Sequence, residues 1–155
     1  MKKTYIIALV CILIDQIIKN ILINAIEVGT SVPIIKNFFN ITIVMNDGAA
    51  FSILRSKTLF LIATSLIVII ININYLKKLD NSKKLERSIY GILLGGIIGN
   101  LIDRIIYKAV IDYLDFSIFS YPFPIFNFAD ICIVVSIIII VILALKEEKN
   151  GNKSR

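Results

Sequence analysis

The chain has 155 residues, of which 57% are hydrophobic, and its mean hydropathy is +0.86. This apolar fraction far exceeds what a soluble domain of such length needs, so the composition predicts a single integral membrane domain over residues 1–155. The net charge of +6 lies mostly in short tracts beside apolar runs, which favours membrane topology over nucleic-acid binding, and the lack of His excludes imidazole metal sites and histidine-based catalytic pairs.

Four apolar runs are long enough to cross a bilayer, which takes about 20 residues per helix. They cover residues 4–22, 58–75, 88–107 and 126–145. Soluble helices this apolar on every face would need a much larger core than the chain can build. The predicted fold is therefore an all-α membrane protein, a bundle of four transmembrane helices.

The basic residues predict the orientation of these helices. Lys2 and Lys3 precede the first run, five basic residues lie between the second and third, and the tail carries four more. The link after the first run is longer but has three, and the link before the fourth run has Lys108 alone. Because Lys and Arg are enriched on the cytoplasmic side, we expect both termini to face the cytoplasm.

Cys11 raises two alternatives for the first run. The segment ending at Cys11 is similar to a signal peptide with a lipoprotein cleavage site, but the apolar pattern continues through Asp15 to Leu22. A retained helix is the better interpretation. A disulfide between Cys11 and Cys132 is possible, yet both lie inside apolar runs, which favours two buried free thiols.

The link between the first and second runs contains a segment typical of strands. "FFNITIVMN", residues 38–46, is rich in aromatic and β-branched residues and predicts one or two short strands at the membrane surface. "NDGAAF", residues 46–51, follows with an Asp-Gly turn signal. We expect a small β-rich loop on the extracytoplasmic side, between the first two helices.

Polar residues occur in three of the four runs at one predicted depth, near the extracytoplasmic side. They are Asp15 and Lys19 in the first run, Asn100, Asp103 and Arg104 in the third, and Asn127 and Asp130 in the fourth. Spacings of three and four place the residues of each helix on one face. An ion pair, an arginine anchor and a helix cap could explain them separately. Their common depth instead favours a shared, partly hydrated site.

Two acids that share a proton would suit this site. The ionised acid takes a proton from water, and the protonated acid polarises a carbonyl and then protonates the leaving amine. Asp130 is one candidate. Its partner could be Asp112 or Asp115, which follow the third run, whereas Asp103 is disfavoured by the neighbouring Arg104.

Other functions remain possible from the residues alone. A serine–lysine peptidase could use Lys19 with Ser52 or Ser56. An ion-coupled transporter would place its polar groups at the midplane and commonly shows repeat symmetry, and neither feature is evident. Carboxylates are the only strong metal ligands in the predicted site, so we expect no metal and no other cofactor.

Five motifs, taken in order, resemble the bacterial lipoprotein signal peptidase family, the type II signal peptidases. They are "DQIIK" at 15–19, "NDGAAF" at 46–51, "GGIIGNLIDR" at 95–104, "VIDYLDF" at 110–116 and "FPIFNFAD" at 123–130. The resemblance covers nearly the whole chain. It implies an integral membrane aspartic endopeptidase of the bacterial cell membrane.

The resemblance also implies roles for single residues and a substrate. Asp112 and Asp130 match the catalytic dyad, which makes Asp115 a neighbour only. Supporting residues match at Asp15, Lys19, Asn46, Gly48, Asn100, Asp103, Arg104 and Asn127. The implied substrate is a prolipoprotein with a diacylglyceryl-modified cysteine, cut on the amino side of that cysteine at the outer face of the membrane. A monomer surrounded by membrane lipids would suffice, with no nucleic-acid partner.

Overall fold

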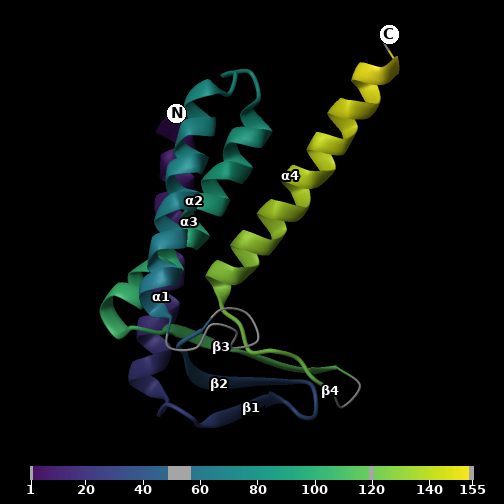
Figure 1. The fold of residues 1–155 in the computed structure, drawn as a ribbon. Coiled ribbons are helices and arrows are strands. Elements are labelled where there is room, and N and C mark those ends of the chain that lie inside the picture. The colour runs from purple at the N-terminus through teal and green to yellow at the C-terminus, as the bar shows by residue number, and fades with distance from the viewer. Residues whose placement is uncertain (1, 49–56, 119–120, 154–155) are drawn as a thin grey trace.

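Four long helices stand on a small β-sheet in the computed structural model, which describes residues 2–48, 57–118 and 121–153 (Figure 1). The helices are α1 (Lys2–Ala25), α2 (Thr58–Lys78), α3 (Lys84–Tyr107) and α4 (Phe128–Lys153). Each is long and apolar enough to cross a membrane, which confirms the predicted bundle. The observed helices are somewhat longer than the apolar runs, because polar end residues continue the helical turns.

α3 lies at the centre of the bundle and packs against α1, α2 and α4. In its apolar window 61% of the residues are buried, against 22% or less in the other helices. Glycines allow this central position. A Cβ atom at Gly95 would lie 2.8 Å from the backbone oxygen of Ala8 in α1, and one at Gly96 would lie 2.6 Å from that of Ala129 in α4. Larger residues would force both neighbouring helices away from α3.

The sheet is antiparallel, with strand order β1-β2-β3-β4. β2 (Phe39–Asn46) occupies the segment predicted to form one or two strands. β1 (Ser31–Ile35) lies before that segment and was not predicted; it pairs with β2 in a hairpin in the link between α1 and α2. β3 (Val110–Ile118) follows α3 and pairs with β2, and the short β4 (Tyr121–Pro122) pairs with the end of β3. The sheet therefore joins two links of the chain, and is larger than the predicted loop. The second half of the "NDGAAF" motif, together with Ser52 and Ser56, lies outside the described residues.

A small core joins the sheet to the helices. Three buried residues form it, namely Ile43 of β2 and Ile111 and Tyr113 of β3. They pack against apolar side chains that include Ile18 and Leu22 of α1. We call this the sheet end of the bundle, where α1 and α3 finish and α2 and α4 begin. Both termini lie at the opposite, far end (Figure 1).

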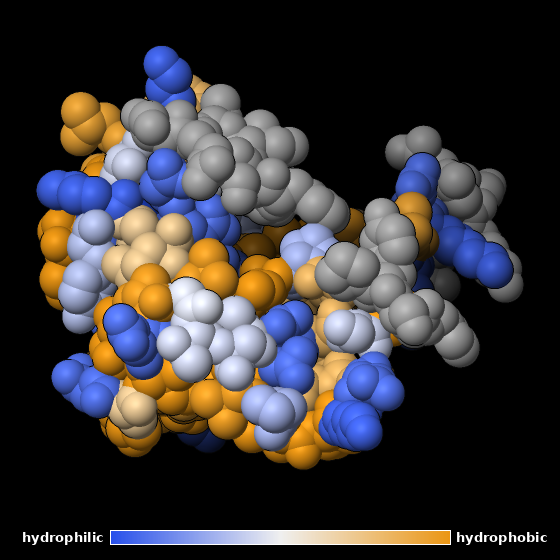
Figure 2. Space-filling view, turned by 90° about the horizontal axis from the view of Figure 1, so that it is seen from below, coloured by the Kyte–Doolittle hydropathy of each residue, from blue (hydrophilic) through white to orange (hydrophobic). Residues whose placement is uncertain are grey.

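The surface at the sheet end and the surface along the sides of the helices differ in polarity. Seen from the sheet end, hydrophilic and hydrophobic side chains are mixed (Figure 2). The sides of the helices instead expose large apolar residues, among them Ile17, Leu59, Ile70 and Ile138. Such continuous apolar sides suit contact with lipid, since no water is available there to solvate polar groups.

Candidate active site

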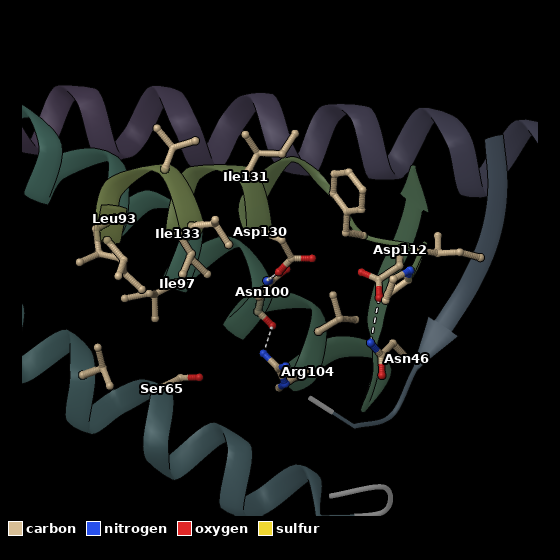
Figure 3. Close-up of a pocket in the computed structure, with 18 of the residues that line it drawn as sticks. Asn46, Ser65, Leu93, Ile97, Asn100, Arg104, Asp112, Asp130, Ile131 and Ile133 are labelled. Atoms are coloured by element: carbon tan, nitrogen blue, oxygen red, sulfur yellow. Dashed lines mark hydrogen bonds between the residues drawn. The ribbon is translucent and has the colours of Figure 1, made fainter. Parts of the chain in front are cut away.

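A cavity of about 950 Å³ lies between α2, α3 and α4 and reaches the sheet. Most of its lining is apolar. Its polar and charged residues near the sheet are Asn46 of β2, Asn100 and Arg104 of α3, Asp112 of β3 and Asp130 of α4. Figure 3 shows the carboxyl groups of Asp112 and Asp130 pointing toward one another. Four separate elements thus bring five of the ten predicted site residues into the lining of the cavity.

Asp130 is held at the first turn of α4. The side chain of Asn127 accepts a hydrogen bond from the backbone N–H of Asp130 (2.9 Å), and the carboxylate of Asp130 accepts one from the backbone N–H of Asn127 (3.2 Å). This reciprocal arrangement is a capping box. The side-chain amide of Asn100 also donates to Asp130, at 2.7 Å. The helix cap considered from the sequence therefore exists, and its carboxylate also lines the cavity.

Asp112 lies on β3 with a side chain that is only 3% exposed. Its two carboxyl oxygens accept hydrogen bonds from the side-chain amides of Asn46 (2.8 Å) and Asn127 (2.7 Å). Burial, followed by the negative charge of Asp130, raises the pKa of Asp112 to about 7. The carboxyl group can therefore retain a proton near neutral pH.

Two asparagines connect the acids. The Asn127 amide that donates to Asp112 also donates to the side-chain oxygen of Asn100, at 3.2 Å. Asn100 in turn donates to Asp130. A continuous series of hydrogen bonds thus runs from Asp112 through Asn127 and Asn100 to Asp130. It restrains the relative positions of the two carboxyl groups.

Lys19 forms a buried charge cluster with Asp15 and Asp103. Its Nζ atom lies 2.8 Å from a carboxyl oxygen of each acid and 3.0 Å from the side-chain oxygen of Asn100. All three side chains are buried. Because the three ammonium protons all have acceptors, Lys19 is poorly suited to act as a base. This geometry disfavours the serine–lysine alternative.

The same cluster holds the elements that carry the cavity acids. Asp15 accepts the backbone N–H of Ala129 in α4 at 3.0 Å, and Asp103 accepts that of Ile111 in β3 at 3.2 Å. Gln16, which has no role in the sequence interpretation, donates to Asp103 at 2.9 Å. The only sequence signal for a role of Gln16 is its position inside the "DQIIK" motif, because its partner lies on a helix far away along the chain.

Gly48 and Arg104 border the acids. The backbone N–H of Gly48 donates to the side-chain oxygen of Asn46 at 3.0 Å, which leaves the amide of Asn46 free to donate to Asp112. Arg104 makes long hydrogen bonds to the carbonyl oxygens of Asn100 (3.4 Å) and Gly48 (3.5 Å). Among the described residues its guanidinium group has no other hydrogen-bond acceptor, and it can still donate into the cavity there.

Asp115 and Asp103 form their hydrogen bonds and ion pairs away from the cavity. Asp115 accepts hydrogen bonds from Thr42 at 2.6 Å and Asn40 at 3.4 Å on β2. Asp103 belongs to the cluster around Lys19. Of the three acids considered as partners of Asp130, Asp112 is the one that lines the cavity.

The cysteines and possible metal ligands complete the description of the interior. Cys11 and Cys132 are free thiols, as predicted, but of the two only Cys132 is buried, and Cys11 is half-buried. Within residues 2–48, 57–118 and 121–153, no group of three or more His, Cys, Asp or Glu side chains could hold a metal ion. The polar groups that line the described cavity are carboxyl groups, amides, a guanidinium and the hydroxyls of Thr64 and Ser65.

Comparison with known proteins gives a family match and similar solved structures, among them the following two. Residues 7–146 match the family described as signal peptidase (SPase) II. The first structure, described as a bacterial membrane enzyme determined by the in meso method at 2.3 Å resolution, has a TM-score of 0.90 and 33% identity, and the match covers 97% of this chain and 92% of the other. The second, described likewise at 1.9 Å resolution, has a TM-score of 0.85 and 34% identity, with 94% of each chain covered.

Proposed function

The chain belongs to the signal peptidase II family of aspartic peptidases, which remove signal peptides from lipoproteins, and on this basis we propose that Asp112 and Asp130 are its catalytic dyad. The observation that carries the proposal is the shared cavity wall, where both carboxyl groups point toward one another (Figure 3). The series of hydrogen bonds through Asn127 and Asn100 supports it, because it restrains both acids together.

The proposed reaction uses one proton held by the pair. The ionised carboxylate takes a proton from a water molecule, whose oxygen attacks the carbonyl carbon of the scissile peptide bond. The protonated carboxyl group donates a hydrogen bond to the carbonyl oxygen, which becomes negatively charged. The C–N bond then breaks, and a proton passes to the leaving nitrogen. Two close carboxyl groups cannot both ionise easily, which favours this singly protonated state.

We further propose that the substrate is a prolipoprotein whose cysteine carries diacylglycerol, cut on the amino side of that cysteine. The apolar lining of the cavity continues away from the acids along α3 and α4, through Ile97, Leu93, Ile133 and Ile137. Such a lining offers a favourable environment for acyl chains or an apolar peptide. A lipidated substrate is already confined to the membrane, so proximity is supplied before any contact with the peptide forms.

The proposed location is the bacterial inner membrane, with the acids near the extracytoplasmic face and a monomer as the working unit. The scarcity of basic residues in the two links at the sheet end supports this orientation. Single cysteines at Ser31 and Lys149, in a background with both natural cysteines replaced by Ala, would report it. A membrane-impermeant maleimide should label Ser31→Cys in intact cells and Lys149→Cys only after lysis. The opposite labelling would reverse the proposed topology.

The dyad is tested with Asp112→Asn and Asp130→Asn in a cleavage assay with lipidated and unlipidated precursors. Each variant should insert normally and lose cleavage of the lipidated precursor, because an amide can neither take nor supply the catalytic proton. Asp115→Asn is the matched control on the same strand and should keep substantial activity. Normal turnover by either dyad variant, or loss of activity in the control, would show that the assignment is wrong.

A further inference from the structure

The start of α4 is held by acceptors from three elements. The first four N–H groups of a helix have no acceptor within it and must find one elsewhere. Here the backbone N–H groups of Asn127, Phe128, Ala129 and Asp130 donate to Asp130, the hydroxyl of Tyr113, Asp15 and Asn127, respectively. Every acceptor is a side chain, so substitutions can remove each one separately.

Tyr113 differs from the other acceptors in its place on the chain. It follows Asp112 on β3, is 3% exposed, and accepts the N–H of Phe128 at 3.1 Å. Burial raises the pKa of Tyr113, so the hydroxyl stays protonated and neutral. The backbone N–H groups of Tyr113 and Leu114 also donate to the carbonyl oxygen of Phe126, at 3.1 and 2.8 Å. The strand beside one acid is thus joined directly to the segment before the other.

We propose that Tyr113 is a positioning residue for the peptidase reaction, whose hydroxyl fixes the first turn of α4, and with it the carboxyl group of Asp130, relative to Asp112. The inference rests on the proposed dyad. Asp112 and Tyr113 are adjacent on one strand, and Phe128 and Asp130 lie on one helical turn. A single hydrogen bond between strand and helix therefore acts on the separation of the two acids.

A tyrosine that only fills the core would behave differently. The ring of Tyr113 packs with Ile43 and Ile111, and phenylalanine would fill that space equally well. Phenylalanine cannot accept the N–H of Phe128, so the first turn would shift toward another acceptor. Since a misplacement of about 1 Å can lower a rate about 100-fold, a shift of a fraction of an ångström predicts a loss of about 10-fold in kcat. KM should stay within about twofold, because substrate binding depends on the cavity lining.

The test compares Tyr113→Phe with Tyr75→Phe in detergent micelles, using a lipidated precursor peptide. Tyr75 is a matched control because its hydroxyl also has a strong partner, Glu86 at 2.6 Å, but α2 carries it toward the far end of the bundle. The expected result is a fall of about 10-fold in kcat for Tyr113→Phe alone, with KM little changed and the melting temperature lowered by a few degrees because one buried hydrogen bond is lost. A kcat within about twofold of wild type, or an equal loss in the control, would overturn the proposal.

Two further proteins separate the possible outcomes. Asp130→Asn is measured in parallel. Activity in that variant would refute the proposed dyad. An inactive Asp130→Asn beside a fully active Tyr113→Phe would refute only the proposed role of Tyr113. Should Tyr113→Phe not fold, 4-aminophenylalanine at position 113 places an amino nitrogen near the N–H of Phe128; this nitrogen is a much weaker acceptor than the hydroxyl oxygen, because its lone pair is delocalised into the ring. An intermediate kcat in that protein supports the proposal, and an unchanged kcat or a loss confined to KM contradicts it.

Discussion

Replacing Lys19 by Met tests the buried charge cluster directly, because methionine has a similar length and no charge. In the wild-type chain the ammonium group lies 2.8 Å from both Asp15 and Asp103, and the Lys19 side chain is 1% exposed. The variant leaves two buried acids without their shared cation. Neither acid can turn to water without breaking its bond to the backbone of Ala129 or Ile111.

The expected cost follows from this burial. Removing one partner of a buried ion pair costs about 3–5 kcal/mol, since an uncompensated charge stays in a medium of low polarity. For a chain of this size 1 kcal/mol shifts the melting temperature by about 2–4 °C. Lys19→Met should therefore melt about 6–20 °C below wild type. Lys77→Met, at an exposed position near the end of α2, should change the unfolding free energy by less than about 0.5 kcal/mol.

Thermal denaturation in detergent micelles, followed by circular dichroism, measures these differences. A third protein combines Lys19→Met with Asp15→Asn and Asp103→Asn, which removes both unpaired charges. It should recover at least half of the lost melting temperature, because amides can keep hydrogen bonds without a counter-charge. A single variant that melts within about 2 °C of wild type, or a triple variant no more stable than the single, would refute the reasoning.

Three other changes have definite expected outcomes. The pKa of Asp112 is about 7 in the folded chain, above its ordinary value of 3.8, so kcat/KM should fall as pH rises through about 7. The stability that the neutral acid contributes is fully present below about pH 4 and should be lost as pH rises through about 7. A flat pH–rate profile would contradict this. Gly99→Ala should lower the melting temperature and activity together, since a Cβ there would lie 2.6 Å from a carboxyl oxygen of Asp15. Arg87 donates hydrogen bonds to the carbonyl oxygens of Leu76 (3.2 Å) and Leu79 (2.7 Å) at the end of α2, remote from the cavity acids. Arg87→Met should therefore lower the unfolding free energy by about 1.5–3 kcal/mol and leave KM unchanged. An unchanged unfolding free energy would argue against that contact.

The features that sequence reasoning predicted well are those with local signals. The transmembrane helices follow from continuous apolar runs, whose length is set by the bilayer. The pairing of Asp15 with Lys19 follows from helical spacing, and so does the cap formed by Asn127 and Asp130. In each case the partners lie within one turn of a helix, so no knowledge of the tertiary structure was needed.

The features it did not predict depend on contacts between distant segments. "VIDYLDF" has no regular alternation, and β3 forms because β2 offers a partner strand far away in the chain. The contacts of Gln16 with Asp103 and of Tyr113 with Phe128 likewise join separate elements. The choice of Asp112 over Asp115 needed the resemblance to a family, because both acids fit the spacing equally well.

The charge cluster also has a consequence for biogenesis. α1 precedes α3 along the chain and is synthesised before it, so Asp103 is not available to Lys19 until α3 has been made. Asp15, one helical turn away, can pair with Lys19 within α1 alone, and such pairing lowers the free-energy cost of placing a charged side chain in the membrane. When α3 arrives, its acid and the amide of Asn100 complete the environment of the cation. In the folded chain Lys19 thus links the first helix to the third, so full neutralisation of the charges in α1 depends on α3 taking its place at the centre of the bundle.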